Sequence, residues 1–159
     1  MKKITKLLLC CCIFLITTAC SGEKNTGLNV KTTIYPISFI TEQLYTNGNT
    51  SSIYPDGAET ENYNLTEKQI KEHSRSELFI YNGLNEREQN IAKSFINNNR
   101  KLQIIDVAYG LKNENGLEEL WLSPNYFLML TTTIKNNLIN SINNKYTIEE
   151  IEKKYKELA

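Results

Sequence analysis

Residues 76–84 read SELFIYNGL, and they contain a short apolar run, Leu78 to Tyr81, between polar neighbours. Every position of this run is apolar, so it lacks the alternation of a strand that exposes one face to water. Such a run is typical of a strand buried on both faces, and strands of this kind belong to parallel sheets that helices cover. The stretch therefore predicts a buried parallel strand.

Two more strands are expected before this one. Residues 30–34 are rich in β-branched side chains, and residues 51–54 form a second short run that ends at the turn Pro55-Asp56-Gly57. Pro36 favours the start of a helix that extends to about Tyr45. The upstream part of the chain thus predicts strand, helix and strand in succession.

The same alternation continues around the opening stretch. Thr66 and Gln69 have the spacing of a capping box, which predicts a helix from there to about Ser74. After residues 76–84, a helix is expected over 87–97 and a strand over 102–107. Strands and helices in this order predict an α/β fold, a single lobe with a parallel sheet flanked by helices, over residues 29–124.

The pattern changes after the polar loop 110–118. Ser123-Pro124 is a favourable helix start, and an apolar stripe at helical spacing follows it. The residues of the stripe are Phe127, Leu130, Ile134, Leu138 and Ile142. Asn143-Asn144 interrupts this helix, and Thr147 to Glu150 has the spacing of a second capping box. A helix that starts so close to Ala159 predicts that residues 125–159 lead towards a further part of a larger architecture.

The amino terminus has the pattern of an export signal. Three lysines precede the apolar residues 7–16, a stretch too short to cross a bilayer core of about 30 Å as a helix. Thr17-Thr18-Ala19 then leads into Cys20, which matches a bacterial lipobox in which the cysteine is diacylated. Two acyl chains suffice for stable membrane attachment. We therefore expect a signal peptide at 1–19, a lipid-anchored tether at 20–28 and an extracytoplasmic location at the cell membrane; a conventional signal with a chance cysteine is the alternative.

Composition excludes several classes of function. The chain has 18 basic and 18 acidic residues and no basic tract, which argues against a nucleic-acid partner. Its four cysteines are Cys10, Cys11, Cys12 and Cys20, all in or beside the signal, and His73 is its one histidine. Zinc sites built from cysteines and histidines are excluded by this count, and cysteine or Ser-His-Asp catalysis is equally unsupported. We therefore expect no enzyme.

Four segments in order resemble a known family. They are residues 32–36 (TTIYP), 55–59 (PDGAE), 76–84 (SELFIYNGL) and 120–124 (LWLSP). Together they are similar to the amino-terminal half of the metal-binding solute-receptor lipoproteins of zinc and manganese ABC importers, also called adhesin-type lipoproteins. The resemblance covers about residues 29–158. It implies two α/β lobes joined by a long helix, a metal in the cleft between them, and an ABC permease in the membrane as partner.

The resemblance also locates two candidate ligands. Where the family has histidines, this chain has Glu61 after the Pro-Asp-Gly turn and Glu119 before the Leu-Trp-Leu segment. Carboxylates suit Mn²⁺, Mg²⁺ or Ca²⁺ better than an imidazole set that favours Zn²⁺. Two ligands make half a site, so water, Glu59, Glu118 or a separate second-lobe chain has to complete it. The resemblance then implies that residues 125–159 are the start of the interlobe helix, and we expect them to lead to a second lobe that is absent from these 159 residues.

Two functions are consistent with these residues. The first is a lipid-anchored, truncated half-receptor that delivers a divalent metal, manganese or zinc, to an ABC importer through Glu61 and Glu119. The second is a degenerate lobe without metal binding, a surface interaction or adhesion module or a remnant, in which both glutamates are solvated loop residues. His73 is expected away from the ligand positions. The aromatic residues Tyr35, Tyr54, Tyr63, Tyr81 and Trp121 are expected in the core.

Overall fold

The structure is a computed structural model that describes residues 27–111 and 119–159. The predicted signal peptide, the lipidation site Cys20 and most of the tether lie outside the described residues, as does Glu118. Within the described ranges no helix is both long and apolar enough to cross a membrane.

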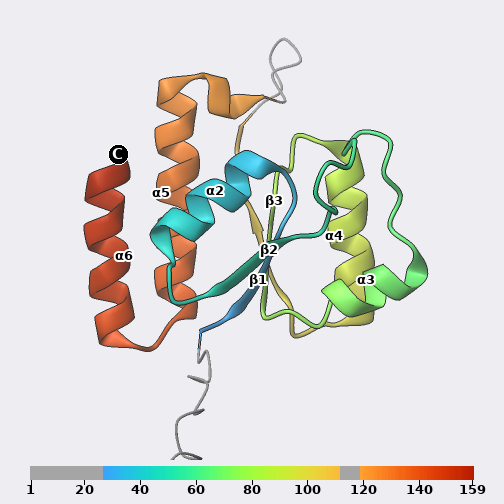
Figure 1. Ribbon diagram of the computed structural model, residues 1–159, viewed down its shortest axis with the longest axis horizontal. Helices are drawn as coiled ribbons and strands as arrows, with labels where there is room; N and C mark the ends of the chain where they lie inside the picture. Colours follow the sequence, from blue (N-terminus) through green and yellow to red (C-terminus); the bar gives the residue numbers. More distant parts are fainter. Residues whose placement is uncertain (1–26, 112–118) are drawn as a thin grey trace, which may run out of the picture.

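The centre of the molecule is a four-stranded parallel sheet (Figure 1). Its strands are β1 (Asn29–Thr32), β2 (Asn49–Ser52), β3 (Leu78–Tyr81) and β4 (Gln103–Asp106), in the spatial order β2-β1-β3-β4. The predicted buried strand at 76–84 is therefore β3, and it pairs with β1 on one side and β4 on the other. The prediction of a parallel α/β sheet is confirmed.

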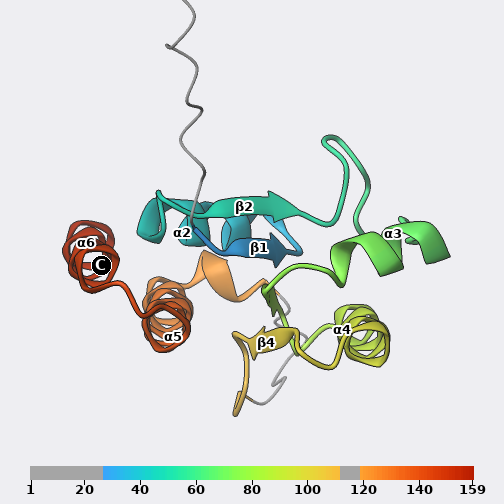
Figure 2. The ribbon, with the colours of Figure 1, turned by 90° about the horizontal axis from the view of Figure 1, so that it is seen from below.

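In residues 27–111 and 119–159, five α-helices cover the two faces of the sheet (Figure 2). They are α2 (Tyr35–Leu44), α3 (Glu67–His73), α4 (Glu86–Asn98), α5 (Pro124–Ser141) and α6 (Lys145–Leu158), and a short 3-10 helix, η1 (Leu120–Leu122), precedes α5. The connection through α2 moves from β1 towards β2, whereas those through α3 and α4 move towards β4. Because parallel crossovers are right-handed, opposite directions place the helices on opposite faces. Accordingly α2, α5 and α6 cover one face, and α3 and α4 cover the other.

The side chains of β3 divide between the two cores. Leu78 and Ile80 belong to the cluster under α2, α5 and α6, together with Ile134 of α5 and Ile151 of α6. Phe79 faces the other way and packs on Phe95 of α4, with ring centroids 4.8 Å apart. An apolar residue at every position of β3 thus has a place in a core, which is what a strand covered on both faces requires.

One of the two predicted capping boxes is present. The Thr66 hydroxyl accepts from the Gln69 amide, and the Gln69 side chain accepts from the Thr66 amide, so α3 starts where expected. The second prediction is wrong: α6 starts at Lys145, and the Asn144 side chain accepts from the Thr147 amide at 3.2 Å. Asparagine is a stronger N-cap than threonine and lies three residues earlier, so Thr147 becomes the third residue of the helix.

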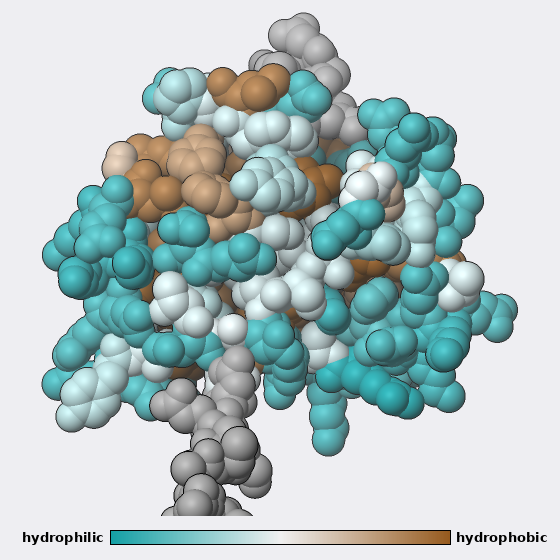
Figure 3. Space-filling view, in the orientation of Figure 1, coloured by the Kyte–Doolittle hydropathy of each residue, from teal (hydrophilic) through white to brown (hydrophobic). Residues whose placement is uncertain are grey.

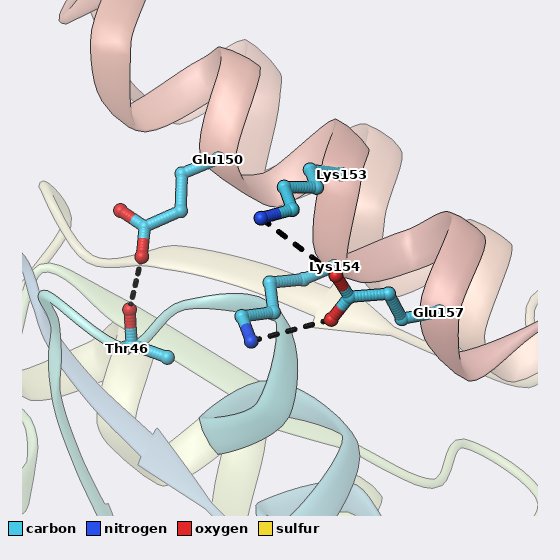
Figure 4. A network of polar contacts seen from close by, with 5 residues as sticks. All are labelled: Thr46, Glu150, Lys153, Lys154 and Glu157. Atoms are coloured by element: carbon cyan, nitrogen blue, oxygen red, sulfur yellow. Dashed lines mark hydrogen bonds and ion pairs between the residues drawn. The ribbon is translucent and has the colours of Figure 1, made fainter.

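Helix α6 runs back alongside α5 and docks on the lobe. Its Glu150 carboxylate accepts from the Thr46 hydroxyl at 2.7 Å, in the turn between α2 and β2 (Figure 4). The same carboxylate also accepts from the Asn47 side-chain amide at 2.7 Å. Thr132 and Tyr155 hydroxyls share a hydrogen bond of 2.8 Å between α5 and α6. The predicted apolar stripe of α5 is buried at Leu130, Ile134 and Leu138. Helices α5 and α6 are separated by residues 142–144, and both contribute to the core on this face of the sheet.

Candidate functional site

The carboxyl ends of the four strands meet at one edge of the sheet, and a cleft opens there. The helices that follow β1 and β3 leave the sheet towards opposite faces, which makes the gap between these two strands the topological switch point where ligands of open α/β sheets bind. A cleft of about 510 Å³ lies at this position. Its lining is formed by Ile34, Tyr35, Tyr54, Thr60, Glu61, Asn82, Asn85, Arg87, Glu88, Glu119 and Trp121.

Both predicted ligand residues line this cleft. Glu61 comes from the loop after β2, and Glu119 directly precedes η1, so segments far apart in sequence line one cleft. Both side chains are exposed. In the described part of the chain neither carboxylate accepts a hydrogen bond from a neighbour, which leaves their oxygens accessible to a cation from solvent.

A third carboxylate, Glu88, forms the floor of the cleft and was missed by the sequence reasoning. Glu88 is only 4% exposed, and its Oε2 accepts from the Thr33 hydroxyl and the Asn82 amide, both at 2.7 Å. It thereby joins the chain after β1 to the chain after β3. A signal was available in the sequence: Glu88 lies three residues after Asn85, which caps α4 by accepting from the Glu88 amide.

Asp106, at the end of β4, fixes the neighbouring loops. Its Oδ1 accepts from the Gly83 amide at 2.9 Å and from the Ala108 amide at 2.8 Å. A Cβ on Gly83 would lie 1.9 Å from Asp106 Oδ2, so only glycine allows the carboxylate to approach this backbone. Glu88 and Asp106 together hold the loop after β3 from two sides.

Arg87 lies between the two glutamates of α4 and reaches the loop that carries Glu61. Its guanidinium donates to the backbone carbonyls of Glu61 and Tyr63 and to Asn64 Oδ1, the last at 2.7 Å. The first turn of α4 thus contacts both sides of the cleft, through Arg87 to the loop after β2 and through Glu88 to the ends of β1 and β3.

Aromatic side chains form part of the wall. Tyr54 is buried, as expected, and packs edge-on against Tyr63 with ring centroids 5.9 Å apart. Burial raises the pKa of Tyr54 to about 12, with the Glu88 charge adding to the effect and Arg87 opposing it. Tyr35 is 78% exposed, so its expected place in the core is wrong. It is the first residue of α2, at the mouth of the cleft, where none of the described elements covers it.

His73 lies away from the cleft, at the end of α3. Its ring is 6.3 Å from that of Phe95, on the face of the sheet covered by α3 and α4. Burial lowers the pKa of His73, with the charge of Lys31 adding to the effect and Glu72 opposing it. The expectation that His73 is separate from the two ligand positions agrees with this placement.

The donor set of the cleft is small. Among the described residues no group of three or more His, Cys, Asp or Glu side chains is arranged to hold a metal ion. The accessible donors are two carboxylates, which suit oxygen-preferring divalent cations that retain water ligands. The cleft can therefore supply part of a coordination sphere for a cation that other groups complete.

A parallel α/β lobe with a polar cleft at its switch point is an arrangement in which open α/β proteins bind small ligands. The particular family follows from comparison: the profile of the family described as "ZnuA: Zinc-uptake complex component A periplasmic" matches residues 30–158, and the chain belongs to this family. A search of curated proteins gave no match.

Solved structures show the same fold. The metal-dependent lipoprotein YcdH from Bacillus subtilis is 24% identical with a TM-score of 0.70, over 82% of this chain and 50% of that one. The zinc-bound ZnuA-like domain of AdcA from Streptococcus pneumoniae is 23% identical with a TM-score of 0.69, over the same shares of the two chains. A manganese-bound variant of a periplasmic metal binding protein from Candidatus Liberibacter asiaticus is 18% identical with a TM-score of 0.69, over 82% and 51%. The chain thus spans about half the length of the structures it matches.

Proposed function

We propose that the protein is the metal-binding receptor component of an ABC metal importer, attached by lipid at Cys20 to the extracytoplasmic face of the cell membrane. One observation carries the proposal: in a chain of the zinc-uptake family, Glu61 and Glu119 line a single cleft at the switch point of the sheet. The names of the neighbouring structures, which include zinc-bound and manganese-bound receptors, support a divalent metal as the solute.

In this proposal the metal is cargo and no covalent chemistry takes place. Glu61 and Glu119 supply oxygen ligands, which favours Mn²⁺ over Zn²⁺ relative to a site made of imidazoles. Water or ligands from outside the described lobe complete the coordination sphere. The permease and its ATPase, rather than this chain, supply the energy of transport.

Metal titration of the full chain in detergent tests the proposal. Calorimetry with Mn²⁺ and with Zn²⁺ should show saturable binding in the wild type, and the isosteric double variant Glu61→Gln, Glu119→Gln should lose it. A matched double variant, Glu42→Gln, Glu149→Gln, removes the same charge from exposed glutamates elsewhere and should bind as the wild type does. Absence of binding in the wild type, or equal loss in the control, contradicts the proposal.

The lipid anchor has its own test. Replacement of Cys20 by alanine should prevent incorporation of labelled fatty acid, because both acyl chains depend on the cysteine thiol. A Cys12→Ala control, within the signal, should leave labelling unchanged. Retention of label in the Cys20 variant contradicts the assignment.

The alternative function is an interaction module without metal binding. Exposed apolar side chains around the mouth of the cleft favour it, since Tyr35 is 78% and Leu122 is 71% exposed. Figure 3 shows further apolar atoms gathered over the upper parts of α2 and α5. Exposed apolar surface of this kind is typical of contact sites between proteins. The titration above separates the two functions, because this alternative requires no binding of either metal.

A further inference from the structure

The loop between β2 and α3 contains a turn that is bonded mainly to itself. The amides of Asn62 and Tyr63 both donate to the Glu59 carbonyl at 3.0 Å, and Asn62 Nδ2 donates to the Glu59 carboxylate at 3.2 Å. These bonds shape the turn, and the Tyr63 side chain anchors its end, since its hydroxyl accepts from Gln69 Nε2 at 2.7 Å and its ring packs on Tyr54. The part of the turn that carries Glu61 lies before this anchor. In the described part of the chain, the hydrogen bond that attaches Glu61 to another element comes from Arg87.

Arg87 holds this turn through three acceptors. Its guanidinium bonds the carbonyls of Glu61 and Tyr63 and the side-chain oxygen of Asn64, so the fork spans the carboxyl-terminal half of the turn. A planar guanidinium presents several donors in fixed directions, whereas a lysine ammonium is a compact point charge on a flexible stem. The arrangement therefore depends on the shape of the fork as well as on its charge.

Two hollows meet at this contact. The cleft described above lies on one side, and an open groove of about 610 Å³ between the loop and the outer face of α4 lies on the other. Glu61, like Arg87, lines both hollows. The contact between Glu61 and Arg87 is thus part of the wall that separates the cleft from the groove. If this contact is lost, the Glu61 segment of the turn can move towards the cleft or towards the groove.

We propose that Arg87 is a positioning residue: its fork holds the turn 59–64 against α4 and so keeps the Glu61 carboxylate on the wall of the cleft. The ligand role of Glu61 rests on the proposed function above, whereas the attachment of the turn does not. Glu88, the next residue, holds the floor of the cleft independently through Thr33 and Asn82.

Lysine and glutamine substitutions at Arg87 distinguish the effect of the guanidinium's shape from the effect of its charge. Arg87→Lys keeps the charge and loses the fork, and Arg87→Gln loses both. If Arg87 positions the turn through its fork, the two variants behave alike; if its charge alone matters, Arg87→Lys behaves as the wild type. Arg100→Gln removes an exposed arginine just beyond the other end of α4 and serves as the matched control.

The first measurement is hydrogen exchange of the full chain in detergent, read over residues 58–65. Loss of the fork should speed exchange of the Asn62 and Tyr63 amides about tenfold in both Arg87 variants and leave it unchanged in Arg100→Gln. Wild-type exchange in Arg87→Lys overturns the proposal, as does an equal increase in Arg100→Gln.

The second measurement is the affinity and the electron paramagnetic resonance spectrum of bound Mn²⁺. With Glu61 displaced, both Arg87 variants should bind about tenfold more weakly and give a changed spectrum, while Arg100→Gln retains both properties. Equal affinity and identical spectra in the wild type and all three variants would show that Arg87 does not position Glu61 for metal binding, and would overturn the proposal. No binding by the wild type overturns the proposed function instead, and hydrogen exchange then still decides whether Arg87 holds the turn.

Discussion

The floor of the cleft and its rim, which we define by Glu61 and Glu119, both carry carboxylates, but the Glu88 carboxylate of the floor is buried and hydrogen-bonded whereas those of the rim are exposed. On the floor, Glu88 accepts hydrogen bonds from the Thr33 hydroxyl and the Asn82 amide, and behind it Asp106 at the end of β4 accepts from the Gly83 and Ala108 amides. On the rim, Glu61 and Glu119 extend exposed carboxylates from long connections. A carboxylate with satisfied partners inside the fold stabilises it, whereas one that faces water costs the fold little and stays accessible to a solute.

This difference has an energetic meaning. Removing a buried acceptor leaves its donors without partners, and each such donor costs about 1–3 kcal/mol. Removing an exposed carboxylate leaves water in its place, and surface substitutions of this kind usually change stability by no more than about 0.5 kcal/mol. Stability measurements on single variants therefore test which carboxylates belong to the floor.

Glu88→Ala should have the largest effect. It removes the acceptor of the Thr33 hydroxyl and of the Asn82 amide, so we expect a loss of about 3 kcal/mol in the free energy of unfolding. Denaturant unfolding followed by circular dichroism measures this loss. Glu86→Ala, which removes an exposed carboxylate from the same helical turn, is the control and should change stability only slightly. Equal losses in the two variants would show that the charge of the helix terminus, rather than the floor, is responsible.

Gly83→Ala should have the next largest effect. The added Cβ overlaps Asp106 Oδ2, so the carboxylate must move and its Oδ1 loses the bond from the Gly83 amide, at a cost of about 2 kcal/mol. Asp106→Ala makes room for the methyl group. The double variant should therefore be less unstable than the sum of the two single variants, since the sites are coupled. Additive losses would contradict the steric explanation.

The pKa of Tyr54 tests the electrostatic effect of the Glu88 carboxylate on the floor of the cleft. Its pKa is raised from 10.0 to about 12, so the folded state retains the proton that the unfolded state has lost. Stability should therefore fall as the pH rises from 10 towards 12, and Tyr54→Phe should remove this part of the decline. Tyrosinate absorbance and denaturant unfolding across this range give both readouts. Because the Glu88 charge contributes to the shift, Glu88→Gln should lower the pKa of Tyr54. An unchanged pKa would show that the Glu88 charge does not act on Tyr54.

Much of the fold could be predicted because its signals are local. The apolar run Leu78 to Tyr81 identifies a strand covered on both faces, and the Thr66 and Gln69 side chains mark the start of α3. The start of α6 was misplaced because Asn144 and Thr147 both suit a cap, and the choice depends on where the helical backbone begins. Tyr35 was misplaced because its exposure depends on which elements meet at the sheet edge.

The site could be predicted only in part. Glu61 and Glu119 follow from the resemblance to a receptor family, and the structure brings both to one cleft, while their role as ligands stays a prediction. Glu88 was missed because its partner Thr33 lies 55 residues away in sequence. Arg87 was missed for a similar reason: its acceptors are mostly backbone carbonyls, and no side-chain pattern indicates which carbonyls a loop presents.

The smallest effect on stability, and the sharpest contrast with the floor, should come from Glu61→Gln combined with Glu119→Gln. Without metal, we expect the double variant to unfold within about 0.5 kcal/mol of the wild type, because both side chains are exposed. With Mn²⁺ at about 100 times the dissociation constant, the wild type should gain about 2.7 kcal/mol and the variant nothing, since only a ligand bound to the folded state stabilises it. Thermal unfolding with and without Mn²⁺ measures both quantities. A loss above about 1 kcal/mol without metal would assign these carboxylates to the fold itself, and the distinction between floor and rim would then fail.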